Sequence, residues 1–388
     1  MSGLAQAEWL NRPETQAIFA ALDGGRRRTR AVGGVVRDTI MGREHSGDID
    51  MATELLPEEV IERAKAAGIA AYPTGIEHGT VTLKLGDTLA EVTTLRRDVE
   101  TDGRHAVVAF GTDWTEDARR RDFTLNALYC AADGTLYDPL NGVEDARNGR
   151  IAFIGEAAQR IAEDGLRVYR FFRLSASHGG EQFDPDGLTA CAAAVGRLDH
   201  LSRERVGGEV MRMLGLPRVA LTLAVMSEIG LLPLADQVLR DLVGYEDLGG
   251  QSAVSRLALV AGGDLDALQE QWRLSNETAG QGRAIARAAI LLADDRIAEA
   301  AYRHGEFAVE GLALAAAKGK WPTARLAEAA RMLSSLVVPP FPVSGHDLAG
   351  LGMTPGPALG QELARLERAW IDSGFALGKP ELLTLAKI

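Results

Sequence analysis

The sequence predicts an α+β fold, in which a head of mixed strands and helices is followed by an all-helical remainder. Before about residue 150, segments of period-two alternation and segments of helical apolar spacing follow one another. Beyond that point the strand signals stop, and alanine- and leucine-rich segments with 3.6-residue periodicity take their place. The length of 388 residues favours two or three domains over one.

The head alternates short predicted helices and strands. Two of its segments have helical spacing and end at glycines: residues 15–22 and 35–41. Three segments are expected to be strands: 30–32, 81–85 and 89–95. The last two are joined by Gly86-Asp87, which predicts a β-hairpin. The polar stretch 98–113 contains Gly103 and Gly111, and we expect a mobile loop there.

The remainder is expected to be built from packed helices. Helical periodicity marks five segments: 157–175, 203–214, 218–229, 264–274 and 277–292. The proline-rich stretch 338–342 predicts a linker before a C-terminal piece. We therefore expect a head (1–150), a helical neck (151–215), a helical body (216–336) and a helical tail (337–388).

Composition excludes several classes of protein. Two cysteines are too few for a disulfide scaffold or a zinc cluster, and they fit a reducing cytoplasm. No apolar run approaches the roughly 18 residues of a membrane span, and the N-terminus lacks the pattern of a signal peptide. The net charge of -12, taken alone, argues against a nucleic-acid partner, but arginines cluster locally at 26–30, 119–121 and 167–173. We therefore expect a cytoplasmic protein without a membrane partner, whose bulk charge decides little about its ligands.

The most informative stretch contains Asp48 and Asp50. On a strand, two residues separated by one other leave the same face, and like charges placed side by side repel. A divalent cation removes that repulsion, and hard oxygen ligands favour magnesium. Glu91, on an alternating strand, is either a third carboxylate of this site or a solvated strand residue; its sequence context fits both equally.

A phosphate-binding element precedes these carboxylates. Gly33 and Gly34 lie between a predicted strand and a helix N-terminus, where free N–H groups and the helix dipole suit an anion. Arg37, in the first turn, is expected to reach the same anion. Metal, phosphate cradle and arginine together predict nucleotidyl transfer.

Ordered motifs extend this pattern along most of the chain. They are GG-x-x-RD (33–38), DIDMAT (48–53), RRDFTLNALY (120–129), YDPLNGVED (137–145), RIAEDGLRVYRFFRLSA (160–176), LSRERVGGEV (201–210) and FPVSGHDLAGLGMTPGPALG (341–360). In this order they resemble the class II tRNA nucleotidyltransferase and bacterial poly(A) polymerase family. The resemblance implies a polymerase-β-like nucleotidyltransferase head with a mixed or antiparallel sheet, followed by a helical neck, body and tail.

A possible base-recognition pair follows in the neck. On a helix, Asp164 and Arg167 would be neighbours at i and i+3. A carboxylate accepts hydrogen bonds and a guanidinium only donates them, so the pair would match the edges of cytosine and adenine and reject guanine and uracil. The alternative is an ordinary surface ion pair. The extension of the same stripe by Arg170 and Arg173 favours a row that faces the nucleotide.

The resemblance assigns further roles. It implies that Asp164, Arg167, Arg170 and Arg173 contact the incoming nucleotide, as do Arg121, Asp122 and Asn126 of the RRDFTLNALY motif. Three consecutive arginines could equally bind the tRNA backbone. Asp138 resembles another position near the site, or is a turn residue before Pro139. The segment 101–108, with Asp102, Gly103, Arg104 and His105, matches a loop that the family uses when it switches to adding A.

The predicted function is template-independent addition of CCA to the tRNA 3′ end. CTP and ATP are the expected substrates, Mg²⁺ the cofactor, and the 3′ end and acceptor arm of tRNA the partner. Alternatives are a poly(A) polymerase, an enzyme restricted to CC or to A addition, or a catalytically silent RNA-binding module. The oligomeric state is not predicted.

Overall fold

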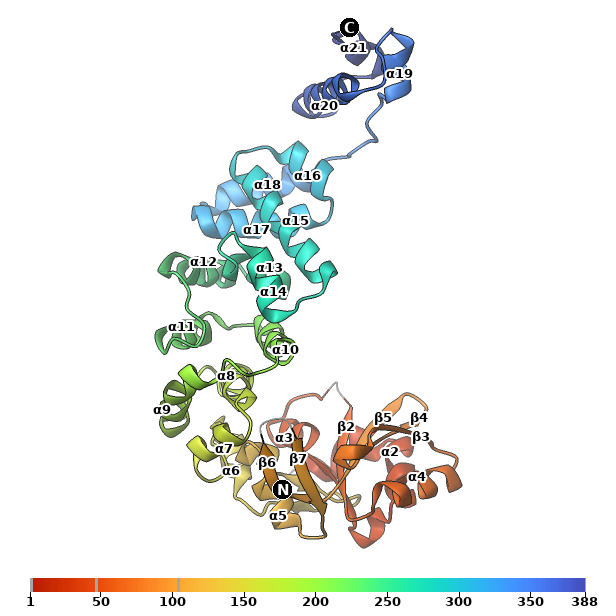
Figure 1. Ribbon diagram of the computed structural model, residues 1–388, viewed down its shortest axis with the longest axis vertical. Helices are drawn as coiled ribbons and strands as arrows, with labels where there is room; N and C mark the ends of the chain where they lie inside the picture. The colour runs from red at the N-terminus through yellow and green to blue at the C-terminus, as the bar shows by residue number, and fades with distance from the viewer. Residues whose placement is uncertain (1–2, 46–47, 103–104, 388) are drawn as a thin grey trace. The chain divides into compact units, whose positions relative to one another are not determined.

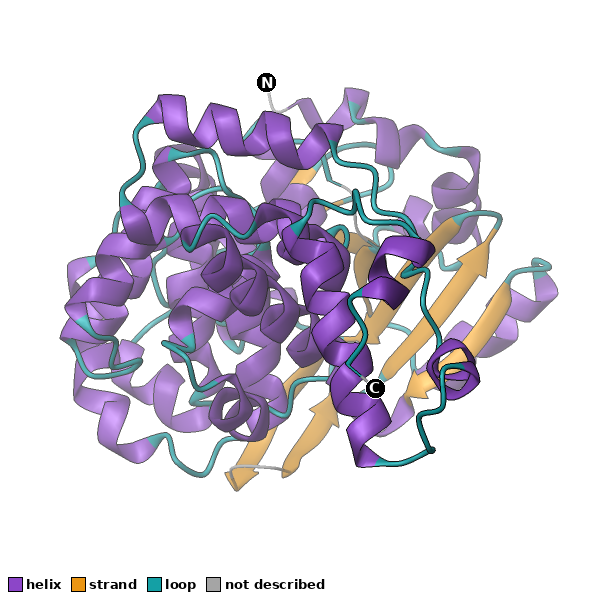
Figure 2. Cartoon of the chain, turned by 90° about the horizontal axis from the view of Figure 1, so that it is seen from above, coloured by secondary structure: helices purple, strands orange, loops and turns teal. Residues whose placement is uncertain are grey.

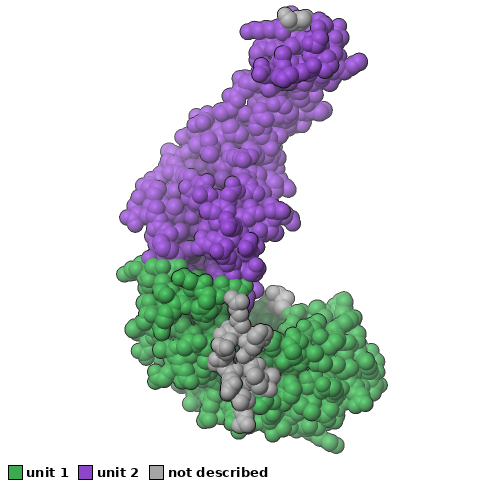
Figure 3. All heavy atoms as spheres, viewed as in Figure 1, with its two compact units in different colours: residues 1–202, 228–231 green, residues 203–227, 232–388 purple. Residues whose placement is uncertain are grey.

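The computed structural model describes residues 3–45, 48–102 and 105–387, with the side chains of residues 97–108 outside the description. The chain forms two compact units (Figure 3). Unit 1 is Met1–Ser202 with Glu228–Leu231, and unit 2 is Arg203–Ser227 with Leu232–Ile388. Within the described residues all strands, orange in Figure 2, belong to unit 1. The predicted α+β head and helical remainder are therefore confirmed.

A seven-stranded mixed sheet organises unit 1, in the order β3-β4-β5-β2-β1-β8-β9. Figure 1 labels β2, β3, β4 and β5 of this sheet. The strands are β1 Thr29–Val32, β2 Ile49–Thr53, β3 Ala70–Gly75, β4 Thr80–Leu85, β5 Thr88–Thr94, β8 Tyr129–Cys130 and β9 Leu136–Tyr137. β2 and β5 run parallel, and the other neighbouring strands run antiparallel. The predicted hairpin is the β4–β5 pair.

Helices complete unit 1. They are α1 Glu8–Asn11, α2 Pro13–Ala21, α3 Gly34–Ile40, α4 Pro57–Ala66, α5 Trp114–Arg119, α6 Gly142–Asn148, α7 Ala157–Glu163, α8 Leu166–His178 and α9 Pro185–Ala194. The sequence predicted α2 and α3 within two residues at each end. An apolar cluster around Trp114 and Tyr129 packs on the sheet, and an aromatic cluster around Phe123 and Phe171 joins α8 to the segment before β8.

The prediction of a loop at residues 98–113 is wrong for most of this segment. Residues Arg96–Asp102 and His105–Phe110 form strands β6 and β7, which pair antiparallel in a sheet of their own. The β6 sequence is too polar to produce the apolar alternation that marks a half-buried strand. Gly103 and Arg104, and the side chains of Asp102 and His105, lie outside the described residues.

Unit 2 is built from helices. They are α10 Arg203–Leu214, α11 Ala220–Glu228, α12 Asp236–Asp247, α13 Ala253–Val260, α14 Leu265–Trp272, α15 Asn276–Ala293, α16 Ile297–His304, α17 Phe307–Gly319, α18 Thr323–Ser335, α19 Gly345–Gly350, α20 Pro357–Asp372 and α21 Lys379–Thr384. The four helices predicted here are present, and the proline-rich stretch 338–342 carries no regular structure. Among the described residues, no helix has the length and apolar character of a membrane span.

Small residues set the packing of unit 2. A Cβ atom on Gly207 of α10 would lie 2.3 Å from the backbone oxygen of Trp272 at the end of α14, so only glycine allows this approach. Gly311 of α17 contacts α15 in the same manner, with its ideal Cβ 2.7 Å from that of Ala288. Sequence periodicity missed α17 because it is apolar on most sides, as a buried helix is.

Candidate active site

Three carboxylates gather where β2 and β5 run side by side. Ile49 and Met51 are buried, whereas Asp48 and Asp50 are exposed. The two aspartate side chains therefore point to the face of the sheet opposite to that of Ile49 and Met51. Asp50 is in direct register with Glu91 of β5. The parallel pairing of these two strands therefore places Glu91 beside the aspartate pair.

The ionisation of these groups reflects their crowding. Although Asp50 keeps some exposure, the surrounding protein partly desolvates its carboxyl group and raises its pKa, while the nearby charges of Arg121 and His45 favour the charged form. The pKa of Glu91 is also raised, first by loss of water and then by the charges of Asp50 and Asp48. The site therefore holds acidic groups that repel one another unless a cation lies between them.

Gly33 connects β1 to α3 directly beside Asp50. Its φ of 75° and ψ of -128° favour glycine, and an ideal Cβ there would lie 3.8 Å from Asp50 Oδ2. Gly34 begins α3, with its ideal Cβ 3.5 Å from His45 Cε1. The predicted glycine pair thus borders the carboxylate site.

Arg37 lies in the interior rather than at the surface of the site. Its Nη1 donates to Asn126 Oδ1 at 2.7 Å and its Nε to Asp38 Oδ1 at 2.8 Å. Burial lowers the pKa of Arg37, against the effect of Asp38, and the charge of Arg173 lowers it further. The contacts of Arg37 hold Asn126 and Asp38, and its direct contact with a triphosphate stays a prediction.

Asp38 is a buried residue whose role the sequence did not suggest. His45 Nδ1 lies 3.0 Å from its Oδ2, and His178 Nε2 of α8 lies 3.1 Å from its Oδ1. The other ring nitrogen of His45 lies 3.2 Å from the backbone oxygen of Asp48. A chain of polar contacts therefore links α8, α3 and the segment that carries Asp48. No spacing signal in the sequence pointed to it, because its members are 7 and 140 residues apart.

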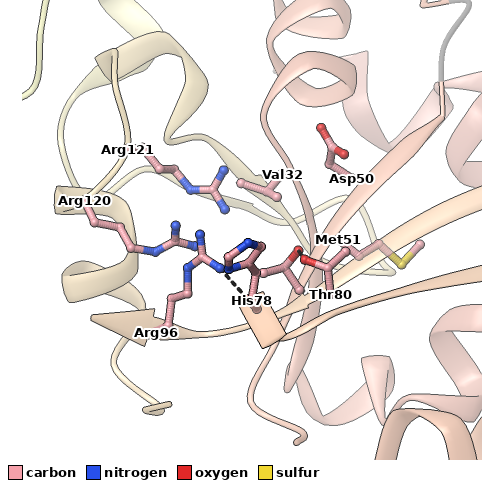
Figure 4. Close-up of a pocket in the computed structure, with 9 residues that line it drawn as sticks. Val32, Asp50, Met51, His78, Thr80, Arg96, Arg120 and Arg121 are labelled. Carbon is pink, nitrogen blue, oxygen red and sulfur yellow. Dashed lines mark hydrogen bonds between the residues drawn. The ribbon is translucent and has the colours of Figure 1, made fainter. Parts of the chain in front are cut away.

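A cavity of about 370 Å³ opens next to Asp50 (Figure 4). Its walls come from β1, β2, β4, β5, the turn before β4, the start of β6 and the end of α5. The polar side chains that line it are Asp50, His78, Thr80, Thr93, Arg96, Arg120 and Arg121. The only charged groups facing Asp50 among these are guanidinium groups, which suits an anionic ligand.

A buried carboxylate holds two of these arginines in place. Asp117, whose side chain is 1% exposed, accepts from Arg120 Nε at 2.8 Å and from Arg121 Nη2 at 3.1 Å. Tyr129 donates its hydroxyl to the same Asp117 at 2.8 Å. Burial would lower the pKa of Arg121, but the charges and hydrogen bonds of Asp117 and Tyr129 together raise it. Arg121 is therefore a fixed, permanently charged group at the cavity wall.

Asp122 and Asn126 form a second buried pair, connected to the neck. Asp122 Oδ1 accepts from Asn126 Nδ2 at 3.0 Å, and Oδ2 accepts from Arg170 Nε of α8 at 2.7 Å. Burial alone would raise the pKa of Asp122, but Arg170 and Asn126 lower it overall. Arg170 also acts electrostatically on Asp50. These predicted residues are thus brought together with the carboxylate site.

The predicted single helix over 157–175 is wrong at its middle. Asp164 has φ -148° and ψ 104°, so the chain breaks there into α7 and α8, and Asp164 Oδ1 accepts from the N–H of Leu166 at 3.0 Å. An ideal Cβ on Gly165 would lie 2.8 Å from Leu198 Cδ2. Gly165 therefore lets this leucine side chain pack closely against the backbone between α7 and α8.

Arg167 is anchored by partners other than those its spacing suggested. Its Nη1 donates to Glu163 Oε2 at 2.7 Å and to the Arg160 carbonyl at 2.8 Å. Its Nη2 donates to the Arg120 carbonyl at 3.0 Å. Arg167 therefore ties α8 to the α5 end of the cavity. The expected pairing with Asp164 assumed one continuous helix, and Asp164 is not helical.

Other candidate residues have structural or open roles. Asp138 accepts from the N–H groups of Gly142 and Val143 at 2.9 and 3.0 Å, so it caps α6 as a turn residue does. Within the described part of the chain, no three His, Cys, Asp or Glu side chains are arranged as a metal-binding group. The predicted magnesium site rests on Asp48 and Asp50, with Glu91 as their neighbour.

Comparison with known proteins identifies the family. The Poly A polymerase head domain family matches residues 29–152. "CCA tRNA nucleotidyltransferase 1, mitochondrial" of Homo sapiens is 34% identical over 386 residues, covering 92% of this chain and 86% of that protein. The Danio rerio protein of the same name is 34% identical over 378 residues, with the same coverage. The chain belongs to the CCA tRNA nucleotidyltransferase family.

Solved structures of CCA-adding enzymes share the fold. The Bacillus stearothermophilus CCA-adding enzyme in complex with CTP has a TM-score of 0.78 and 29% identity, covering 93% of this chain and 94% of that one. The Thermotoga maritima enzyme complexed with tRNA has a TM-score of 0.69 at 16% identity, which supports the fold alone. The CCA tRNA nucleotidyltransferase fold therefore extends over nearly the whole chain, including the helical remainder.

Proposed function

We propose that the chain adds CCA to the 3′ end of tRNA, joining CTP and ATP in sequence and releasing pyrophosphate. One observation carries the proposal: the pairing of β2 with β5 places Glu91 beside the Asp48 and Asp50 pair, and Asp50 lines a cavity whose other charged side chains are guanidinium groups. Such a site favours a cation and a polyphosphate together. Membership of the CCA tRNA nucleotidyltransferase family supports the choice of substrates.

Magnesium is the proposed cofactor, held by Asp48 and Asp50. The donor set fits, because these oxygen ligands are hard. Loss of water and, after it, the neighbouring carboxylates raise the pKa values of Asp50 and Glu91, and a divalent cation would favour the charged forms of both groups. When bound, magnesium supplies charge neutralisation at the triphosphate and lowers the pKa of the attacking hydroxyl. Glu91 is the proposed third member of this acidic group.

The protein groups do the positioning. The tRNA 3′-hydroxyl attacks the α-phosphate in line, and pyrophosphate leaves. Arg121, fixed by Asp117, is proposed to neutralise charge on the triphosphate. Gly33 and Gly34 are proposed to let the triphosphate approach the backbone closely. Because holding two reactants in place removes much of the barrier, rigid support of Arg121 matters as much as its charge.

Base selection is proposed to lie with the neck. Asp164 and Arg167 would read the edge of C or A, with Arg170, Arg173, Asp122 and Asn126 contacting or supporting the nucleotide. The anchors of Arg167 to Glu163 and to the Arg120 carbonyl support this role, since a base-reading group must be held rigidly. The tail is the proposed site for the rest of the tRNA, within the four-part division of the chain predicted above.

An incorporation assay tests the proposal. The protein is incubated with magnesium, labelled CTP or ATP, and tRNA that ends before CCA, after C or after CC. Incorporation of C, C and then A, with arrest after three additions, is the expected result. Long A tails would instead make the chain a poly(A) polymerase, and addition of only CC or only A would make it a restricted enzyme. Retained tRNA binding without incorporation would make it a silent RNA-binding module.

A cytoplasmic location is proposed on the state of the cysteines. Cys130 and Cys191 are both buried and free, as in proteins of a reducing compartment. Cell fractionation with an antibody to the chain tests this. Recovery with an organelle, such as the one in the names of the Homo sapiens and Danio rerio relatives, would overturn it.

A further inference from the structure

The cavity beside Asp50 has a second end that the proposed catalytic groups leave unused. Asp50 and Arg121 lie at one end, and His78, Thr80, Arg96 and Arg120 line the rest (Figure 4). We infer that this second end, formed by His78, Arg96 and Arg120, is a subsite that binds a phosphate group of a substrate. The inference rests on the proposed function, because it needs a phosphate-bearing substrate in this cavity.

Charge is the first argument. Arg96, Arg120 and Arg121 line the cavity against a single lining carboxylate, Asp50. Both oxygens of Asp117 are occupied behind the wall by Arg120 and Arg121, so one buried negative charge serves two guanidinium groups. Three cations around one cavity repel one another, and an anion between them removes that cost.

The position of His78 is built by a tight turn. Residues Ile76–His78 form a short 3-10 helix that ends at Gly79, whose φ is 80°. A Cβ on Gly79 would lie 2.6 Å from Phe110 Cε1, so both its conformation and its contact require glycine. Gly79 O accepts from the N–H of Thr94 at 2.9 Å, which fixes the turn to the end of β5. The imidazole is thereby presented to the cavity from a rigid backbone.

Arg96 and two threonines complete the subsite. Arg96 Nη1 donates to the backbone carbonyl of His78, so the guanidinium and the imidazole are coupled in position. Thr80 and Thr93 also line the cavity, and their hydroxyl oxygens lie 3.0 Å apart. Guanidinium, imidazole and hydroxyl groups all donate hydrogen bonds, and a phosphate offers only acceptors at neutral pH.

Two substrates carry phosphate into this cavity: the nucleoside triphosphate and the RNA 3′ end. The test is therefore kinetic, with the KM of CTP and the KM of tRNA measured separately on the full chain. His78→Ala removes the imidazole but keeps the carbonyl that Arg96 binds, and His78→Gln restores an N–H donor. Lys84→Ala, at an exposed position on the same β4 strand, is the matched control for surface change.

The expected result for His78→Ala is a roughly tenfold rise in one KM, with kcat within about twofold of wild type. His78→Gln should recover part of this rise, and Lys84→Ala should change neither KM. A raised KM for CTP, with weaker inhibition by inorganic tripolyphosphate, assigns the subsite to the triphosphate. A raised KM for tRNA, with unchanged tripolyphosphate inhibition, assigns it to the RNA backbone.

Arg96→Lys and Arg96→Gln give a second reading that does not depend on His78. The lysine keeps the charge, so its KM should rise less than that of the glutamine, and the salt dependence of the KM should flatten only in the glutamine variant. An active wild type whose His78 and Arg96 variants leave both KM values unchanged would overturn the subsite alone. An inactive wild type would instead overturn the proposed function.

Discussion

His45 Nδ1 lies 3.0 Å from Asp38 Oδ2, and the opposite nitrogen of the same ring lies 3.2 Å from the backbone oxygen of Asp48. One imidazole thus bridges a buried carboxylate to the segment that carries a proposed metal ligand. Burial would raise the pKa of Asp38, but His178, His45 and Arg37 lower it well below its ordinary range. Asp38 is therefore a permanent anion on which these three groups converge.

This bridge predicts unequal effects of two histidine substitutions. His45→Ala should lower kcat for CTP incorporation by roughly 10- to 100-fold, because His45 alone also contacts the Asp48 backbone. His178→Ala removes a contact to the same Asp38 but none to Asp48, so its effect should be several-fold smaller. Steady-state kinetics at saturating tRNA measure both, and equal losses would contradict a positioning role for His45.

Asp50→Asn should separate activity from stability. We expect CTP incorporation to fall by roughly 1,000-fold, since the proposed cation loses a ligand. The melting temperature of the metal-free protein should stay the same or rise, because the raised pKa of Asp50 indicates a charge that the folded state disfavours. Calorimetry without magnesium checks this, and a large loss of thermal stability would point to a structural rather than a catalytic role.

Asp164→Ala and Arg167→Ala should each weaken the selection of C and A. Arg167→Ala should have the larger effect, because it also removes the contacts to Glu163 and to the Arg120 carbonyl. Competition assays with all four labelled nucleotides measure the selection. If both variants still reject GTP and UTP as wild type does, these residues do not read the base.

Two adjacent glycines of α10 predict opposite changes in stability. A Cβ on Gly207 would lie 2.3 Å from the backbone oxygen of Trp272, so Gly207→Ala should destabilise unit 2 by roughly 1–3 kcal/mol. The nearest atom to a Cβ on Gly208 is Arg212 Nη2 at 3.7 Å, so Gly208→Ala should stabilise the helix by up to about 1 kcal/mol. Urea unfolding distinguishes the two signs.

Glu362 predicts a pH-dependent stability in the tail. It accepts from Arg365 Nε at 2.9 Å and from the N–H of Lys387 at 2.8 Å, and the Arg365 hydrogen bonds lower its pKa from 4.5 to about 2. A lowered pKa stabilises the fold above the ordinary value, and this stabilisation is lost as pH falls from 4.5 towards 2. The difference in melting temperature between wild type and Glu362→Gln should therefore be full at pH 7 and shrink below pH 4.5. A difference that is constant with pH would refute this.

The sequence predicted those features that depend on local spacing. The one-residue separation of Asp48 and Asp50 determines their common face on a strand, and the Gly33-Gly34 step marks the β1–α3 turn. It named Glu91 as a candidate but could not choose between a site carboxylate and a solvated strand residue, because the place of Glu91 beside Asp50 depends on the parallel pairing of β5 with β2. α4, β3 and β4 lie between β2 and β5 in the chain, so the register of the two strands has no local signal in the sequence.

Tertiary contacts explain the remaining differences. The apolar period of 157–175 continues across the break at Asp164, so the sequence reads as one helix where the structure has two. Spacing suggested Asp164, at i-3, as the partner of Arg167, whereas the structure pairs Arg167 with Glu163, at i-4. Gly165 packs closely against Leu198, 33 positions later in the chain, and local sequence patterns cannot predict such a contact.

The parallel pairing of β2 with β5 makes strand alignment part of the chemistry. A slip of either strand by a single residue would send its carboxylate to the opposite side of the sheet and leave an apolar side chain, such as Ile49 or Ala90, in its place. Any substitution that loosens this alignment, however distant from the cavity, should therefore silence the enzyme while most of its hydrogen bonds survive.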